Sequence, residues 1–124
     1  MIDHFCEHKS IKVFIFEETP PLPTYLLTFN AGPYTVYTHE NELEGSPPQR
    51  VFMRQCTKKL DPRNITVLVE RTIKFYENEL FGFKFPFKKL DHVLCPDVRY
   101  AAMESAGCIT YSEVSLTNKR PDQM

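Results

Sequence analysis

The sequence predicts a mixed α+β protein, and two observations carry this prediction. Short runs rich in β-branched and aromatic residues alternate with turn residues over positions 11–54, which is typical of antiparallel strands. An amphipathic stretch at 61–80 has helical spacing, and strand-like runs follow it at 90–95 and 108–111. The chain should therefore fold as an antiparallel sheet followed by a strand–helix–strand unit.

Three of the predicted strands precede residue 39. They are Ile11 to Phe16, Thr24 to Ala31 and Tyr34 to Thr38. The prolines at 20, 21 and 23 cannot donate to a sheet ladder, so we expect a rigid extended connection between the first two strands.

A polar stretch at 39–49 separates these strands from the rest of the chain. Gly45-Ser46-Pro47-Pro48 at its centre makes it the best candidate for a junction between two domains. Val51 to Arg54 is predicted to be the strand that opens the second unit.

The predicted helix begins at Asp61-Pro62, an oxygen-bearing cap followed by proline at the first helical position. Gly82 is expected to end it. Apolar residues recur on one face, which we expect to serve packing only, and charged residues fall on the other. Glu70 is placed on this charged face, where it would pair with Lys74 one turn later. The apolar positions are Ile65, Leu68, Val69, Thr72, Ile73, Tyr76 and Leu80.

A segment of small residues with one acid, Ala101-Ala102-Met103-Glu104-Ser105, is predicted to form a loop between the last two strands. Small residues let another chain approach the backbone, whose N–H and C=O groups can then pair with an extended peptide. A carboxylate beside such an edge can hold the terminal ammonium of a peptide, because that group has a pKa of about 8 and is mostly cationic at neutral pH.

This segment and its flanks resemble the zinc aminopeptidase family, the gluzincins that include alanyl and puromycin-sensitive aminopeptidases and leukotriene hydrolase. Residues 101–113 resemble the exopeptidase motif G-A-M-E-N with its following strand W-G-x-I-T-Y-x-E. Within the five-residue motif, Ala101 replaces the glycine and Ser105 the asparagine. Three further matches occur in the order that the family has them. They are residues 16–27 with F-x-x-T-P-P-x-S-T-Y-L, residues 85–91 with Y-P-x-x-K-x-D, and Pro96-Asp97 with a P-D-F turn.

The resemblance implies a fold and a binding site. Residues 1–47 would be the C-terminal part of the family's N-terminal β-sandwich domain. Residues 48–124 would be the N-terminal part of a thermolysin-like peptidase domain, ending before the zinc-binding helix. By the same resemblance the substrate-binding residues are Ala101, Ala102, Met103 and Glu104. Glu104 would bind the free amino terminus of a peptide, and the backbone of the other three would line the peptide edge.

The family's zinc site, H-E-x-x-H on a helix, is absent from this sequence. The His39-Glu40 pair is followed by Leu43 where the second histidine should stand. Catalytic zinc needs three protein ligands, and we find no other set that supplies them. Zinc is therefore implied by the resemblance alone, and we assign no catalytic residue and no metal ligand within the chain.

The composition limits the classes of binding partner and the cellular location that the sequence predicts. A formal net charge of −1 gives no electrostatic case for nucleic acid or an anionic membrane. The apolar runs are far shorter than the ~20 residues of a membrane helix. The N-terminus lacks the basic-then-apolar pattern of a signal peptide, so we expect a cytoplasmic protein. Without a C-x-x-C pair or a secretory signal, the four cysteines are expected to be free thiols.

Two other patterns have competing interpretations. Alternating phenylalanines at 81–87, interleaved with lysine, are compatible with stacking of single-stranded RNA. Pro86 breaks such a strand, so core packing is favoured. His92 can face a cleft, but a hydrogen-bonded core or edge histidine is the more common arrangement.

The function predicted from the sequence is that of a zinc metallo-aminopeptidase fragment. It would recognise the free amino terminus of a peptide substrate and would be inactive on its own. The alternative is a non-catalytic module, derived from the same family, that binds a peptide or a partner. An H-E-x-x-H motif encoded in frame beyond residue 124 would distinguish the first from the second, and an incomplete gene model is a third explanation of the missing site.

Overall fold

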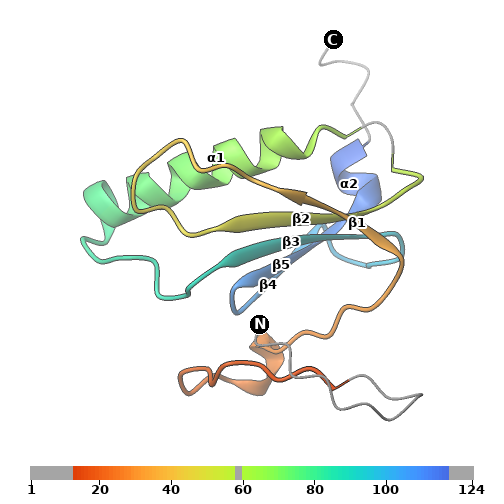
Figure 1. Cartoon of the computed structure of the whole chain (residues 1–124), viewed down its shortest axis with the longest axis horizontal. Coiled ribbons are helices and arrows are strands. Elements are labelled where there is room, and N and C mark those ends of the chain that lie inside the picture. The colour runs from red at the N-terminus through yellow and green to blue at the C-terminus, as the bar shows by residue number, and fades with distance from the viewer. Residues whose placement is uncertain (1–12, 58–59, 118–124) are drawn as a thin grey trace.

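The computed structural model describes residues 13–57 and 60–117 (Figure 1). Within these residues the chain forms one five-stranded sheet with a helix packed against it, which confirms the mixed α+β class. The elements in chain order are η1 (Thr24–Leu26), β1 (Tyr34–Thr38), β2 (Gln49–Arg54), α1 (Pro62–Phe75), η2 (Tyr76–Leu80), β3 (Leu90–Cys95), β4 (Ala102–Ser105), β5 (Cys108–Ser112) and α2 (Glu113–Thr117). No helix among the described residues is long and apolar enough to cross a membrane.

The sheet has the order β1-β2-β3-β5-β4 and mixes both strand directions. β1 runs antiparallel to β2, and β4 runs antiparallel to β5. β3 lies parallel to both of its neighbours. Parallel neighbours need a crossover connection, which α1 supplies between β2 and β3. Five of the six residues of β3 are buried, as expected for a central strand whose side chains are buried on both faces of the sheet. The buried apolar residues are Val51, Ile73, Leu90, Val93, Leu94 and Cys108.

β1 and β2 pair in register from Tyr34↔Arg54 to Thr38↔Arg50. The predicted strands Tyr34 to Thr38 and Val51 to Arg54 are thus confirmed. The polar stretch 39–49, expected to join two domains, connects these two neighbouring strands of one sheet.

The two strands predicted upstream of β1 are wrong for the described residues. Residues 13–16 contain one isolated bridge at Ile15, and residues 11 and 12 lie outside the described part. In place of the second strand, Thr24–Leu26 forms the short 3₁₀-helix η1. β-propensity alone does not make a strand, since the backbone groups need a partner strand. Figure 1 shows this N-terminal segment passing outside the sheet, next to β4.

α1 begins as the sequence predicts. The Asp61 carboxylate accepts the N–H of Arg63 at 3.0 Å, and Pro62 occupies the first helical position. The last turn widens into η2, a π-turn, and Gly82 follows in the left-handed region with φ 71°.

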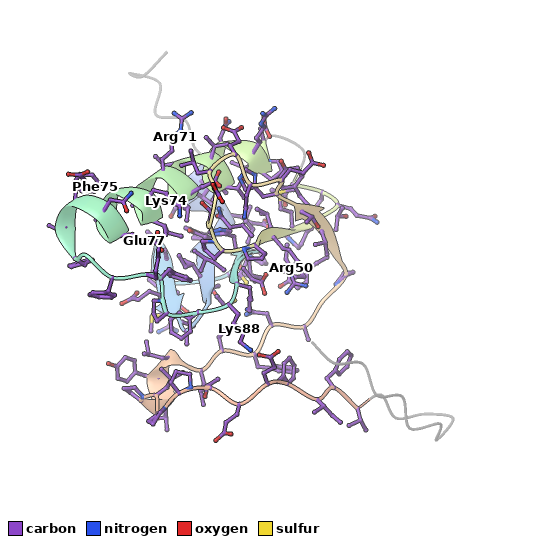
Figure 2. The ribbon with its side chains drawn as sticks, turned by 60° about the vertical axis from the view of Figure 1, so that its left-hand side comes forward. Arg50, Arg71, Lys74, Phe75, Glu77 and Lys88 are labelled. Carbon is purple, nitrogen blue, oxygen red and sulfur yellow. The ribbon has the colours of Figure 1, made fainter. Side chains whose placement is uncertain are left out.

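The predicted faces of α1 are partly wrong. Glu70 is only 1% exposed, whereas Leu68 on the predicted packing face is 67% exposed. Lys74 does not pair with Glu70 but donates to Glu77 at 3.2 Å (Figure 2). The buried positions Thr66, Glu70, Ile73 and Glu77 still recur at helical spacing. The predicted helical period is therefore confirmed, but the helix is rotated relative to the predicted packing face.

The rotation of α1 about its axis is set by buried polar groups, which need hydrogen-bonding partners. Glu70 accepts the backbone N–H of Glu42 at 3.2 Å and of Leu43 at 3.0 Å, and it contacts His39 Nε2 at 3.1 Å. A buried carboxylate is tolerated when its oxygens are hydrogen-bonded. The turn after β1 supplies those donors, and no helical periodicity in α1 reveals them.

Candidate functional site

The motif segment forms an edge strand, not the loop predicted from its small residues. β4 pairs with β5 in the register Ala102↔Tyr111 and Glu104↔Ile109. It is the last strand of the sheet, so no described strand pairs with its outer side. Small residues within an edge strand leave room for an added chain, as they do in a loop.

The hydrogen-bond alternation of β4 shows which backbone groups face outward. Ala101 O accepts the N–H of Ser112, its opposite residue, at 2.9 Å. In an antiparallel pair, residues that bond to the partner strand alternate with residues whose groups point away. The N–H and C=O of Met103 and Ser105 therefore face β5, whereas those of Ala102 and Glu104 face outward. Among the described residues, the outward backbone groups of these two residues have no hydrogen-bonding partner.

The side chains of β4 alternate as well. Ala102 and Glu104 are exposed, Met103 is half-buried and Ser105 is buried. Glu104 makes no hydrogen bond or ion pair with any other described residue. Of the predicted substrate-binding residues, Ala102, Met103 and Glu104 thus lie on the strand and exposed Ala101 lies just before it.

Lys89 contacts the hairpin between β4 and β5 at Gly107. Gly107 has φ 61°, and a Cβ there would come within 3.1 Å of Lys89 O. The carbonyl of Gly107 accepts Lys89 Nζ at 2.8 Å and the N–H of Asp91 at 3.0 Å. These contacts fix the position of the edge strand relative to β3.

An open hollow of about 560 Å³ lies at the Ala101 end of β4. Its lining combines the connection between β3 and β4 with the end of β5 and the start of α2. The residues are Pro96, Asp97, Val98, Arg99, Tyr100, Ala101, Ser112, Val114 and Ser115.

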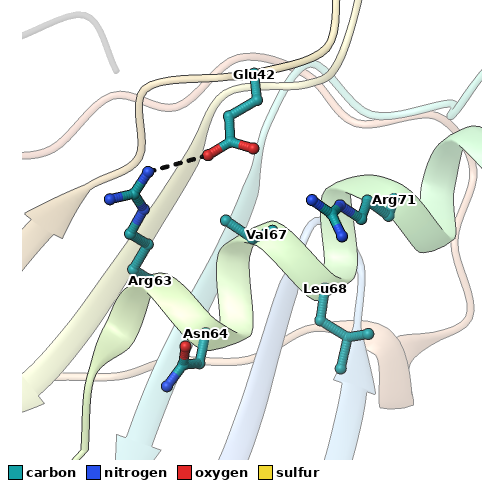
Figure 3. A pocket seen from close by; sticks show the side chains of 6 residues that line it. All are labelled: Glu42, Arg63, Asn64, Val67, Leu68 and Arg71. Atoms are coloured by element: carbon teal, nitrogen blue, oxygen red, sulfur yellow. Dashed lines mark hydrogen bonds and ion pairs between the residues drawn. The ribbon is translucent and has the colours of Figure 1, made fainter.

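A second hollow lies over the outer side of α1 (Figure 3). Arg63 at its rim pairs with Glu42 at 3.1 Å. β3 and β5 stand between β2, against which α1 packs, and the motif strand. This hollow therefore does not belong to the β4 edge.

His92 is a hydrogen-bonded core histidine, as the more common interpretation had it. Its Nε2 lies 2.9 Å from Gln49 Oε1 and its Nδ1 lies 3.2 Å from the Tyr111 hydroxyl. Burial lowers the pKa of His92 to about 4, so the ring is neutral at pH 7. A neutral ring fits both contacts when Nε2–H donates to Gln49 and Tyr111 donates to Nδ1. Burial likewise raises the pKa of Tyr111 to about 12.

The described residues do not fit a zinc ion. Within 13–57 and 60–117, no group of three or more His, Cys, Asp or Glu side chains could hold a metal. Both ring nitrogens of His39 have partners, in Glu70 at 3.1 Å and in the Thr66 hydroxyl at 3.0 Å. We therefore derive no step through a metal from these residues.

Comparison with known proteins finds one matching family model and several similar curated proteins. The Peptidase family M1 domain matches residues 66–123, which include the edge strand β4. Aminopeptidase 2 of Candida albicans is 31% identical over 105 residues, or 85% of this chain and 11% of that protein. The findings support the M1 aminopeptidase family.

Two further similar proteins are also named as aminopeptidases. Aminopeptidase M1-C of Oryza sativa subsp. japonica is 34% identical over 106 residues, which are 86% of this chain and 12% of that protein. Aminopeptidase N of Streptomyces lividans is 31% identical over 100 residues, which are 79% of this chain and 12% of that protein. The chain thus spans 11–12% of the length of these curated relatives.

Proposed function

We propose that this chain is the part of a zinc aminopeptidase that recognises the free amino terminus of a peptide along the β4 edge. The observation that carries the proposal is the position of Glu104. It is an exposed acid without a partner among the described residues, on an edge strand whose outward backbone groups are open. An extended peptide can pair with Ala102 and Glu104 while its ammonium contacts the carboxylate.

Backbone hydrogen bonds along β4, rather than the Glu104 carboxylate, would supply most of the affinity for the peptide. Glu104 is exposed, and exposed ion pairs contribute about 0.2–1 kcal/mol, which corresponds to a ratio of roughly 1.5- to 5-fold in binding. The acid would therefore select for a charged amino terminus more than it would hold the peptide. Selection for the terminus is what an exopeptidase needs.

The proposal extends to the place of this chain within a whole aminopeptidase. Residues 1–47 would belong to the end of a β-sandwich domain and residues 48–124 to the start of a thermolysin-like domain. Zinc and its ligands would come from outside this chain, which would bind peptide without cleaving it. A cytoplasmic location is part of the same proposal.

The test is a titration of the isotope-labelled chain with trialanine amide, followed by amide NMR shifts. We expect shifts centred on Ala102 and Glu104, and binding about two- to fivefold weaker in Glu104→Gln. Glu79→Gln is the matched control, because Glu79 is an exposed acid on η2 that is removed by the same change. The proposal would be refuted by amide shifts that lie only outside β4. It would also be refuted if Glu104→Gln and Glu79→Gln weakened peptide binding equally.

A further inference from the structure

We propose that the hollow over the outer side of α1 binds a carboxylate that is joined to an apolar group. The hollow has a volume of about 380 Å³ and is separate from the β4 edge, so this inference goes beyond the proposed function and does not rest on it. Three observations carry it. They are an arginine without a partner, an apolar surface beside that arginine, and two walls that are joined by buried hydrogen bonds.

The charged side chains that line the hollow leave one positive charge unbalanced. Arg63 donates through Nη2 to Glu42 Oε1 at 3.1 Å. Arg71 makes no hydrogen bond or ion pair with another described residue, and Figure 3 shows its guanidinium apart from that pair. Glu40 and Glu44, in the turn that carries Glu42, are exposed but do not line the hollow. Two guanidinium groups and one carboxylate give the lining a net charge of +1, which favours an anion.

The free guanidinium fits a carboxylate. The two oxygens of a carboxylate match the planar fork of Arg71, and the two groups can form parallel N–H···O bonds. The single negative charge of a carboxylate balances the lining, whereas a phosphorylated side chain carries about −1.5 to −2 at pH 7. The amide of Asn64, which also lines the hollow, can donate to the same ligand.

An apolar surface lies beside the free arginine. Val67 and Leu68 line the hollow, and Leu68 is 67% exposed. Leu68 and Arg71 are three residues apart on a helix, which places their Cβ atoms about 5–6 Å from each other. Covering an exposed leucine is favourable in water. A ligand with an apolar group next to its carboxylate would therefore contact both side chains.

The two walls of the hollow are joined by buried hydrogen bonds. One wall is α1, and the other is the turn after β1. The buried carboxylate of Glu70, on α1, accepts the N–H of Glu42 at 3.2 Å and of Leu43 at 3.0 Å. Asn41 Nδ2 donates to Ser46 O at 2.8 Å and closes the turn. The site is therefore preformed, and a ligand need not order either wall.

The probes are small acids and amides that separate the two parts of the ligand. N-acetyl-leucine has both the carboxylate and the apolar group, N-acetyl-leucinamide lacks the charge, and N-acetyl-alanine has only a methyl side chain. Amide NMR shifts of the isotope-labelled chain at pH 7 should centre on residues 67–71 when N-acetyl-leucine is added. N-acetyl-leucinamide should bind about two- to fivefold more weakly, because an exposed ion pair changes binding by about this factor. N-acetyl-alanine should bind at least about fourfold more weakly, the effect of one apolar carbon that is no longer buried.

Two variants test the two contacts. Arg71→Gln removes the charge but keeps a long polar side chain, and it should weaken binding of N-acetyl-leucine about two- to fivefold while leaving N-acetyl-leucinamide unchanged. Leu68→Ala shortens the apolar side chain at an exposed helical position, and it should weaken binding of N-acetyl-leucine about fourfold. Arg99→Gln is the matched control, because Arg99 is an exposed arginine outside this hollow. Amide shifts of β3 would verify that each variant is folded.

A further probe identifies the source of the carboxylate. N-acetyl-glutamyl-leucinamide carries it on a side chain, whereas N-acetyl-leucine presents it as a peptide carboxyl terminus does. Tighter binding of the first supports an acidic side chain of a partner protein, and tighter binding of the second supports a carboxyl terminus. Equal binding supports the chemistry that the two share.

The inference is refuted if N-acetyl-leucine gives no shifts on α1, or if the acid and the amide bind equally. It is also refuted if the Arg71→Gln and Arg99→Gln variants bind the acid equally. None of these outcomes concerns the β4 edge. Conversely, a lack of peptide binding at β4 would refute the proposed function and leave this inference intact.

Discussion

Glu70 and His92 show how single residues of this chain tolerate burial. Burial by itself raises the pKa of Glu70, but the Leu43 N–H, the His39 ring and the Glu42 N–H together hold it below its usual value. His92, unlike Glu70, is buried in its neutral form, because burial lowers its pKa to about 4. Through these contacts Glu70 connects α1 to the turn after β1, and His92 connects β3 to β2 and β5.

The neutral state of His92 predicts a pH dependence of stability. The unfolded chain has a histidine pKa of about 6.5, so it binds a proton between pH 6.5 and 4 that the folded chain does not bind. Stability should therefore fall as pH decreases, by about 1.5 kcal/mol between pH 6.5 and 5 from this residue. His92→Gln keeps a donor and an acceptor but does not titrate.

Urea unfolding at these two pH values, for the native chain and for His92→Gln, measures the effect. The native chain should lose more stability than the variant on acidification, and both should be equally sensitive to pH above 7. Carboxylates contribute little in this window, because their unfolded pKa values lie near 4. Equal losses in the two proteins would contradict the neutral assignment of His92.

At the scale of elements, local chemistry decides where α1 begins and distant contacts decide how it is turned. Asp61 and Pro62 are sufficient to start the helix, because the cap bond from Asp61 to the Arg63 N–H spans two residues. The rotation of the helix depends on Glu70, which takes its donors from the turn after β1. Leu68 faces outward as a consequence.

The cap gives a direct prediction. Asp61→Ala should destabilise the chain by about 1 kcal/mol, within a usual range of roughly 0.5–2 kcal/mol for lost caps. Asp61→Asn should retain most of that stability, because asparagine caps equally well. Thermal unfolding of the three proteins measures this, and an equal loss in both variants would indicate that the negative charge matters more than the hydrogen bond.

At the scale of the whole molecule, many large apolar side chains remain uncovered. In the N-terminal segment Phe16 is 70% and Phe29 is 92% exposed. At the end of the helical unit Leu80, Phe81 and Phe83 are each more than half exposed. The phenylalanines at 81–87 were expected in the core, and for Phe81 and Phe83 that expectation is wrong.

The chain should bind peptides without cleaving them. Catalytic zinc needs three protein ligands and an open position, and the described residues provide no such group. With zinc added, purified chain should therefore release no chromophore from alanyl or leucyl anilides. Zinc-dependent release that disappears in Glu104→Gln would contradict this expectation.

The sequence by itself determined the elements whose signals are local. These are the cap of α1, the strands β1, β2, β3 and β5, and the small-residue segment with its one acid. Tertiary structure decided which groups of these elements meet. It placed Glu104 on an exposed edge, turned Glu70 inward and set Leu26 against Ala106. Propensity and spacing act over a few residues, whereas pairing and burial depend on partners that lie far apart along the chain.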